Sequence, residues 1–465
     1  MAPDADNADE PGPEVPELAK ATHEHHGSSS ALENLPAELR DQILLSAPDL
    51  LTLRSLVHAS PVLHAQYRTN RDALLRACVA RELDGFFVDA HACLMSRAVA
   101  LGSIRTNVRI TDFLDGYRGQ LSGSRPRADV HSVNKPGSIR WLAAFHRTVA
   151  RPLAHRYSTW ALANLTQASS SSSEDQKAAE TAASEMDIAL SRSEEIRIFR
   201  ALYRYETYYH LFGLNQATRV GIIEMPDINN LFFGLFDPWE SEAIACLDVW
   251  VRQEYERLFD QVQDDLSAKN PKIRLADRHF DYEASLNLNG QREDYMDGSV
   301  SRGLRLTVRL LPVHDHDTLV TKMEHNLIKS HFLDDPIRRI VGSTVQRMRR
   351  DTSLNARDEA EQRRDPMDFT GDAVPPDSPP LAWVRLWGGT YVNIFGEYIP
   401  EPLKQWGHVM WDAQRWAELG AEHLVSKQWE TASNIIEEIE DHYGWRPSGA
   451  DYEDARSEPE PEPEE

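Results

Sequence analysis

Apolar residues recur every three or four positions along most of the chain, and this helical spacing is the strongest constraint on its fold. The clearest segment begins at Asp237-Pro238-Trp239-Glu240, where a capping aspartate, a proline at the first helical position and a glutamate three residues after the cap predict a helix start. Apolar residues keep the helical period from Ile244 to Val262, over about five turns. Only residues 303–311 alternate apolar and polar side chains in a pattern that suits a strand as well as a helix. The sequence therefore predicts an all-α fold with at most one short β-element, near 303–311.

A compact helical module is predicted at residues 32–83. Pro36 precedes its first helix, Asp49 can cap the second, and Ser60-Pro61 supplies both a cap and a first-turn proline for the third. Three helices this short cannot enclose all of their leucines, so we expect several leucines on an outer face. Such a face would favour binding to a partner.

Residues 32–67 (LENLPAELRDQILLSAPDLLTLRSLVHASPVLHAQY) resemble an F-box, a three-helix module that binds a Skp-type adaptor. The matching elements are Leu35-Pro36 with Glu38, the pair Ile43-Leu44, the series Leu50, Leu53 and Leu56, and the terminal aromatic Tyr67. The resemblance implies that the adaptor is contacted by Leu35, Pro36, Ile43, Leu44, Leu53 and Leu56. The third helix lacks the tryptophan common in F-boxes, so the module is similar to a divergent variant found in fungal proteins. The alternative is that 35–83 is the helical start of a core domain, with its leucines buried internally.

The rest of the chain resembles uncharacterised fungal F-box proteins at residues 200–213, 237–259 and 395–420. That resemblance implies a small N-terminal three-helix bundle followed by a larger irregular helical domain. It also implies a non-enzymatic substrate receptor of a cullin-based ubiquitin ligase, with a Skp-type adaptor and an unknown protein substrate as partners. The alternative function is a non-catalytic helical scaffold or regulatory protein that does not engage a ligase.

Composition and spacing divide the chain into six predicted segments. They are a disordered acidic N-terminus (1–31), the F-box-like module (32–83), a helical domain (84–350), a charged and Pro-rich linker (351–380), a Trp-rich helical segment packing on that domain (381–445) and a disordered acidic tail (446–465). Within the helical domain, 139–165 is expected to form a long helix bent at Pro152, and the serine run at 169–174 a linker or a weak helix start.

Tryptophan is concentrated near the C-terminal end of the chain. The candidate substrate-recognition residues are Trp387, Trp406 and Trp411, with Arg415 at their polar rim. The spacing of Trp406, Trp411 and Trp416 is also typical of a buried helix, which we favour over a recognition pocket.

The net charge of −24 disfavours binding to nucleic acid and to anionic membranes. Arginines at 338, 339, 347, 349 and 350 are expected to form a solvated face or to contact the acidic tail. Neither a secretory signal nor a run of about 18 apolar residues occurs, which predicts a cytoplasmic or nuclear protein.

No catalytic residue, cofactor or metal site is predicted. Three cysteines are too few for a disulfide framework or a four-cysteine zinc site, and we expect them to be reduced thiols. His314-Asp315-His316-Asp317 has no matching second cluster, and the histidines at 23, 25 and 26 lie in the predicted disordered start. Glycine-rich phosphate loops and nucleophile motifs are absent from the sequence.

Overall fold

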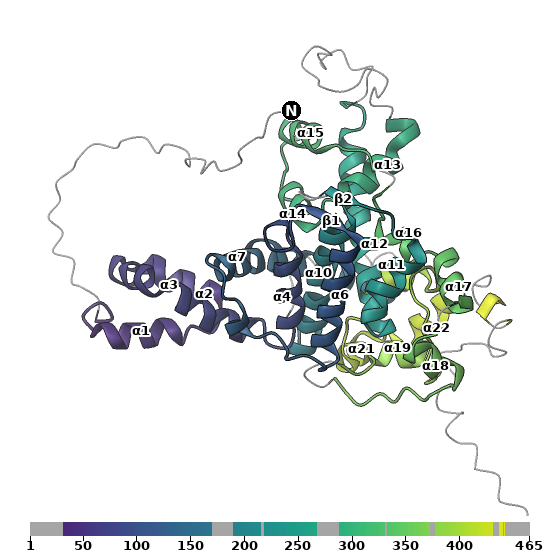
Figure 1. Cartoon of the computed structure of the whole chain (residues 1–465), viewed down its shortest axis with the longest axis horizontal. Helices are drawn as coiled ribbons and strands as arrows, with labels where there is room; N and C mark the ends of the chain where they lie inside the picture. The colour runs from purple at the N-terminus through teal and green to yellow at the C-terminus, as the bar shows by residue number, and fades with distance from the viewer. Residues whose placement is uncertain are drawn as a thin grey trace, which may run out of the picture.

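The computed structural model describes residues 31–169, 189–214, 218–266, 288–330, 333–352, 354–372, 377–430, 437–439 and 441. This part of the chain is predominantly helical and contains one two-stranded sheet (Figure 1). The all-α fold class is confirmed. Among the described residues, none of the helices has the length and apolar character needed to cross a bilayer. The predicted disordered ends and the serine run from residue 170 onward lie outside the described residues, apart from Ala31.

Three N-terminal helices project from one side of the molecule, and we call them the arm (Figure 1). They are α1 (Ala37–Leu45), α2 (Leu50–Ala59) and α3 (Pro61–Glu82). The predicted caps form: Asp49 Oδ1 accepts a hydrogen bond from the Thr52 N–H at 2.6 Å, and Ser60 Oγ accepts from Val62 and Leu63. The backbone leaves helical geometry at Asn70, which bends α3.

Four helices, α4 (Phe87–Ser96), α6 (Asn107–Leu121), α10 (Arg192–Phe212) and α12 (Pro238–Val262), run through the centre of the body (Figure 1). Helix α10 is buried on nearly all sides, because α4 and α12 pack against it. Helix α12 begins where predicted, and the Glu240 carboxylate accepts a hydrogen bond from the Asp237 N–H at 3.2 Å.

The long helix predicted at 139–165 forms with an irregularity. Helix α7 (Ser138–Phe145) continues into a π-helical turn (His146–Ala150) and then into α8 (Arg151–Ser169). The π-helical turn ends two residues before Pro152, whose missing N–H cannot support regular α-helical bonding. The other α-helices are α5 (Ala98–Leu101), α11 (Met225–Phe232), α13 (Leu288–Val300), α14 (Leu304–Leu310), α15 (His316–Asn326), α16 (Ile337–Ile340), α17 (Ser343–Thr352), α18 (Ala356–Gln362), α19 (Leu381–Leu386), α20 (Glu401–Gln405), α21 (Ala413–Leu419) and α22 (Glu422–Glu430).

The short β-element lies elsewhere than predicted. Strands β1 (Ile104–Thr106) and β2 (Thr218–Val220) pair in parallel, with Ile104 opposite Thr218. Residues 303–311 instead contain helix α14, so the strand reading of that segment is wrong. The N–H of Leu304, the first residue of α14, donates a hydrogen bond to the Glu206 carboxylate of α10 at 2.7 Å. This cap, from a residue distant in the sequence, favours the helix.

One hydrophobic core extends from Leu44 in α1 to Ile439 near the C-terminal end. The Trp-rich segment packs on α8 and α12 through α20 and α21. The segment predicted as a linker contains α18, where the Arg357 guanidinium pairs with Asp237 at 3.1 Å. Residues from all of these segments therefore contribute to a shared interior.

The arginine group at 338–350 makes intramolecular ion pairs. Arg338 and Arg339 each lie 3.0 Å from the fully buried Asp297, which Arg252 also contacts. Burial acts to raise the pKa of Asp297, but these guanidinium groups outweigh it and hold that pKa below its ordinary value. Arg347 pairs with Glu438 at 2.9 Å. The acidic partners found thus precede the predicted tail, which itself lies outside the described residues.

Candidate functional site

Three leucines of the arm are exposed to solvent. Leu39 and Leu45 on α1 are 43% and 38% exposed, and Leu51 on α2 is 56% exposed. Large aliphatic side chains at this level of exposure gain free energy when a partner covers them, about 1.5–3 kcal/mol for a fully buried leucine. We call Leu39, Leu45 and Leu51 the outward face.

The structure separates the predicted adaptor-binding residues into two groups. Pro36 is exposed, and Leu35, Ile43 and Leu56 are half-buried, so these four remain within reach of a partner. Leu44 and Leu53 are 0% and 2% exposed and belong to the hydrophobic core. Their predicted contact with an adaptor is therefore wrong for the folded arm, because neither side chain can touch a partner while the arm stays folded.

The F-box-like pattern does not identify the exposed leucines, because it takes no account of the helical period. On α2 the buried positions are Leu50, Leu53 and Val57, spaced by three and four residues. Leu51 falls on the opposite side of that helix. The helical period alone could have identified it from the sequence.

The Glu82 carboxylate is one of the links between the arm and the body. Glu82, the last residue of α3, accepts hydrogen bonds from the Leu50 N–H at 2.9 Å and from Arg151 at 2.8 Å. Its Oε1 also lies 3.3 Å from Nε2 of His146 in the π-helical turn. Burial acts to raise the pKa of Glu82, but the hydrogen bonds and charges of His146, Leu50 and Arg151 together lower it. This link therefore holds two helices of the arm against the start of α8.

We expect the protein to lose stability in acid because of His146, which contacts Glu82. Burial lowers its pKa below the ordinary 6.5, although Glu82 and Glu195 act in the opposite direction and Arg151 reinforces the shift. The Tyr203 hydroxyl, 3.0 Å from Nδ1, also faces the ring. The unfolded chain therefore binds a proton first, and the free energy of unfolding falls as the pH drops below 6.5, by at most about 1.4 kcal/mol per pH unit.

Urea unfolding of the wild type and of His146→Gln, from neutral pH to about pH 5, measures this effect. The variant should lose less stability over that range than the wild type, since it lacks the titrating ring. Equal slopes in the two proteins would contradict the assignment. Glu82, whose lowered pKa adds a loss in the same direction only below about 4.5, is common to both proteins.

The predicted substrate-recognition tryptophans are core residues. Trp387, Trp406 and Trp411 are at most 1% exposed, so they do not line a recognition surface. Arg415 is partly buried, and its guanidinium pairs with the fully buried Glu194 at 2.6 Å. The expected burial is confirmed, but the expected helix is not: Trp406 and Trp411 lie in the turn between α20 and α21.

A second group of exposed apolar residues surrounds the small sheet on the body. Ile104 and Val220 belong to the two strands, and the neighbouring exposed side chains are Val99, Val108 and Ile222. Val99 is the most exposed of them, at 84%. The molecule thus presents apolar residues on the arm and, separately, on the body (Figure 1).

A charged cavity of about 710 Å³ opens between α4, α6, α10 and the start of α12. Arg204 crosses its wall, with side-chain nitrogens 2.8 Å from Asp89 and 2.9 Å from Glu240. Arg118 lies at the same cavity and pairs with Asp115 on the surface. Because these positive charges already have carboxylate partners, the cavity has no excess of positive charge that would favour an anionic ligand.

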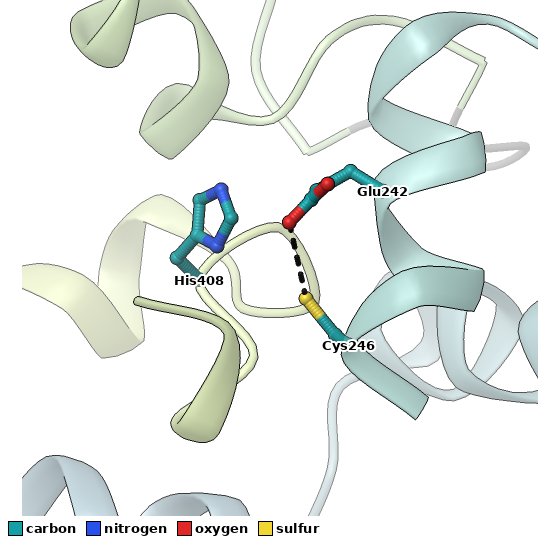
Figure 2. A group of neighbouring side chains, drawn as sticks. All are labelled: Glu242, Cys246 and His408. Atoms are coloured by element: carbon teal, nitrogen blue, oxygen red, sulfur yellow. Dashed lines mark hydrogen bonds between the residues drawn. The ribbon is translucent and has the colours of Figure 1, made fainter. Parts of the chain in front are cut away.

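The structure also brings together three buried side chains that sequence reasoning missed: Glu242, Cys246 and His408 (Figure 2). His408 is far from the other two in the sequence, so no local spacing could reveal the group. The weak metal candidate at 314–317 is not part of it, since His316 pairs with Asp265 at 2.8 Å. Comparisons with protein-family models, with curated proteins and with solved structures found no match to this chain.

Proposed function

We propose that this protein is a substrate receptor of a cullin-based ubiquitin ligase and binds a Skp-type adaptor through the outward face of the arm. The observation that carries the proposal is the exposure of Leu39, Leu45 and Leu51 on helices that project from the body. A helix face of this kind suits insertion into a hydrophobic groove of a partner. Pro36 and the half-buried Leu35, Ile43 and Leu56 extend the same contact in the proposal.

In the proposed function the protein only bridges its substrate and the ligase, so it requires no catalytic group. A receptor holds its substrate near the ligase, so that transfer to a substrate lysine occurs at a high effective concentration. Such a protein needs one surface for the adaptor and another for the substrate. The second apolar group, around β1 and β2, supports this division of roles, and we place substrate binding on the body.

Adaptor binding is tested by replacing two residues of the outward face together, Leu39→Asp and Leu51→Asp. Because about half of each side chain is still exposed, burial on binding contributes about 0.8–1.5 kcal/mol at each position, and loss of both should weaken binding by at least about tenfold. The unfolding free energy should stay within about 0.5 kcal/mol of the wild type, because both side chains are exposed. Titration of the full-length chain with a purified fungal Skp-type adaptor measures the dissociation constant.

A matched control is the pair Val99→Asp and Val108→Asp, which adds the same charges at exposed positions of the body. This control should bind the adaptor as tightly as the wild type. If the variant with Leu39→Asp and Leu51→Asp bound the adaptor as tightly as the wild type, the outward face would not be the docking site. Failure of the wild type to bind would contradict the proposal as a whole and favour the alternative, a helical scaffold that does not engage a ligase.

A further inference from the structure

Two metal-binding side chains occupy one face of the central helix α12. Glu242 and Cys246 are one turn apart, and the Cys246 Sγ lies 3.8 Å from Glu242 Oε1. His408, from the loop after α20, faces both of them (Figure 2). The three residues are completely buried, and one donor atom from each lies within 4.8 Å of the other two.

The His408 ring is held in place by its neighbours. The Leu403 carbonyl acts on the ring, but neither ring nitrogen reaches a partner with full hydrogen-bond geometry. The ring lies between Trp383 and Trp406, with centroid distances of 6.4 and 6.0 Å. Because buried polar atoms are nearly always paired, a buried imidazole beside a thiol and a carboxylate is suited to binding a further ligand.

The carboxylate is oriented in a way that leaves one oxygen for that ligand. Glu242 Oε2 accepts a hydrogen bond from the Gly396 N–H at 2.7 Å, whereas Oε1 faces Cys246. The nearest cation is Lys404, whose ammonium donates to the Gly396 carbonyl at 2.9 Å. The backbone of Gly396 therefore fixes both charged groups, as supporting residues do around metal sites.

Sulfur, imidazole nitrogen and carboxylate oxygen together are the donor set of zinc. In a tetrahedral zinc site the donor atoms are separated by about 3.2–3.6 Å, as follows from metal–ligand bond lengths of about 2.0–2.3 Å. The separations of up to 4.8 Å seen here must shorten by about 1 Å when the three donors close on the metal. Cys246 must lose its thiol proton, and the thiolate and the carboxylate then neutralise the two charges of the metal.

We propose that Glu242, Cys246 and His408 bind Zn²⁺. Three protein ligands leave one tetrahedral position, which a water molecule would fill. The role of the site is structural, because its residues are fully buried and it fastens the loop after α20 to α12. It therefore stabilises the packing of the C-terminal segment on the body. This inference does not depend on the proposed ligase function.

The test uses the full-length chain, purified without a histidine tag and stripped of metal. Co²⁺ is added as a spectroscopic substitute for zinc, and a thiolate-to-cobalt absorption band should appear in the near ultraviolet. Zinc titration should saturate at about one ion per chain and raise the thermal unfolding midpoint. In Cys246→Ser the cobalt band should vanish and the midpoint should no longer respond to zinc.

The matched control is Cys93→Ser, which alters an equally buried thiol outside the cluster and should retain the cobalt band. His408→Gln provides a second ligand variant in case Cys246→Ser does not fold, and it should bind zinc at least about tenfold more weakly. Metal held by the N-terminal histidines would give no thiolate band and would survive both ligand substitutions. A folded wild type without that band, or a band retained in Cys246→Ser, would overturn the proposal.

Discussion

Replacing Arg204 with methionine should lower the free energy of unfolding by about 3–5 kcal/mol. The Arg204 side chain is 3% exposed and pairs with Asp89, which is equally buried, and with Glu240. Methionine preserves much of the side-chain volume but removes the charge, so both carboxylates lose their main partner inside the protein. Breaking a buried ion pair on one side is costly because the remaining charges are poorly solvated, and Arg200, 3.3 Å from Glu240 and 3.9 Å from Asp89, replaces only part of the lost interaction.

Urea unfolding at neutral pH measures this loss, and Arg118→Met is its control. Arg118 lies at the same cavity, but its side chain is 44% exposed and its partner Asp115 is 58% exposed. Water screens that pair, so the control should change stability by less than about 1 kcal/mol. Equal effects of the two substitutions would show that burial does not set the strength of the Arg204 pairs.

Trp411→Ala should cost a similar amount, about 3–5 kcal/mol. The indole is fully buried, and its N–H donates to the Trp406 carbonyl at 2.6 Å. Truncation leaves a cavity under the C-terminal segment and removes that hydrogen bond. Unfolding in urea, together with limited proteolysis of the segment after α20, measures the effect.

The comparison for this second substitution is Trp141→Ala. Trp141 is only half-buried and lies under the Arg97 guanidinium, 3.9 Å from its ring centroid. We expect a smaller loss there, since part of the indole already contacts water. A Trp411→Ala protein as stable as the wild type would restore a binding role for that residue.

Sequence reasoning succeeded where the determinants lie within a few residues of one another. The caps at Asp49 and Ser60 and the start of α12 at Asp237 depend on contacts between residues two or three positions apart. The burial of Trp406 and Trp411 was also expected, although the two residues lie in a turn and not on the helix from which it was inferred. These local signals suffice for helices and for the fold class.

The predictions that failed concern features that depend on residues distant in the sequence. Alternation at 303–311 suited a strand, but the cap that Glu206 supplies to Leu304 comes from 98 positions away. Arg338 and Arg339 are 40% and 43% exposed, as a solvated face requires, but their ion pair with the buried Asp297 was not expected. The zinc candidate needs His408 to reach α12, and the position of the second strand at 218–220 needs β1 beside it. No spacing rule within one segment contains that information.

The ion pair between Glu194 and Arg415 has a consequence for how the protein is made. The two residues are 221 positions apart, so at roughly 5–20 residues per second the ribosome delivers Arg415 about 10–45 s after Glu194. During that interval α10, which is buried on nearly all sides in the finished protein, has no complete set of neighbours. A nascent chain in this state exposes apolar surface, which is prone to aggregate until Arg415 and the elements around it are made.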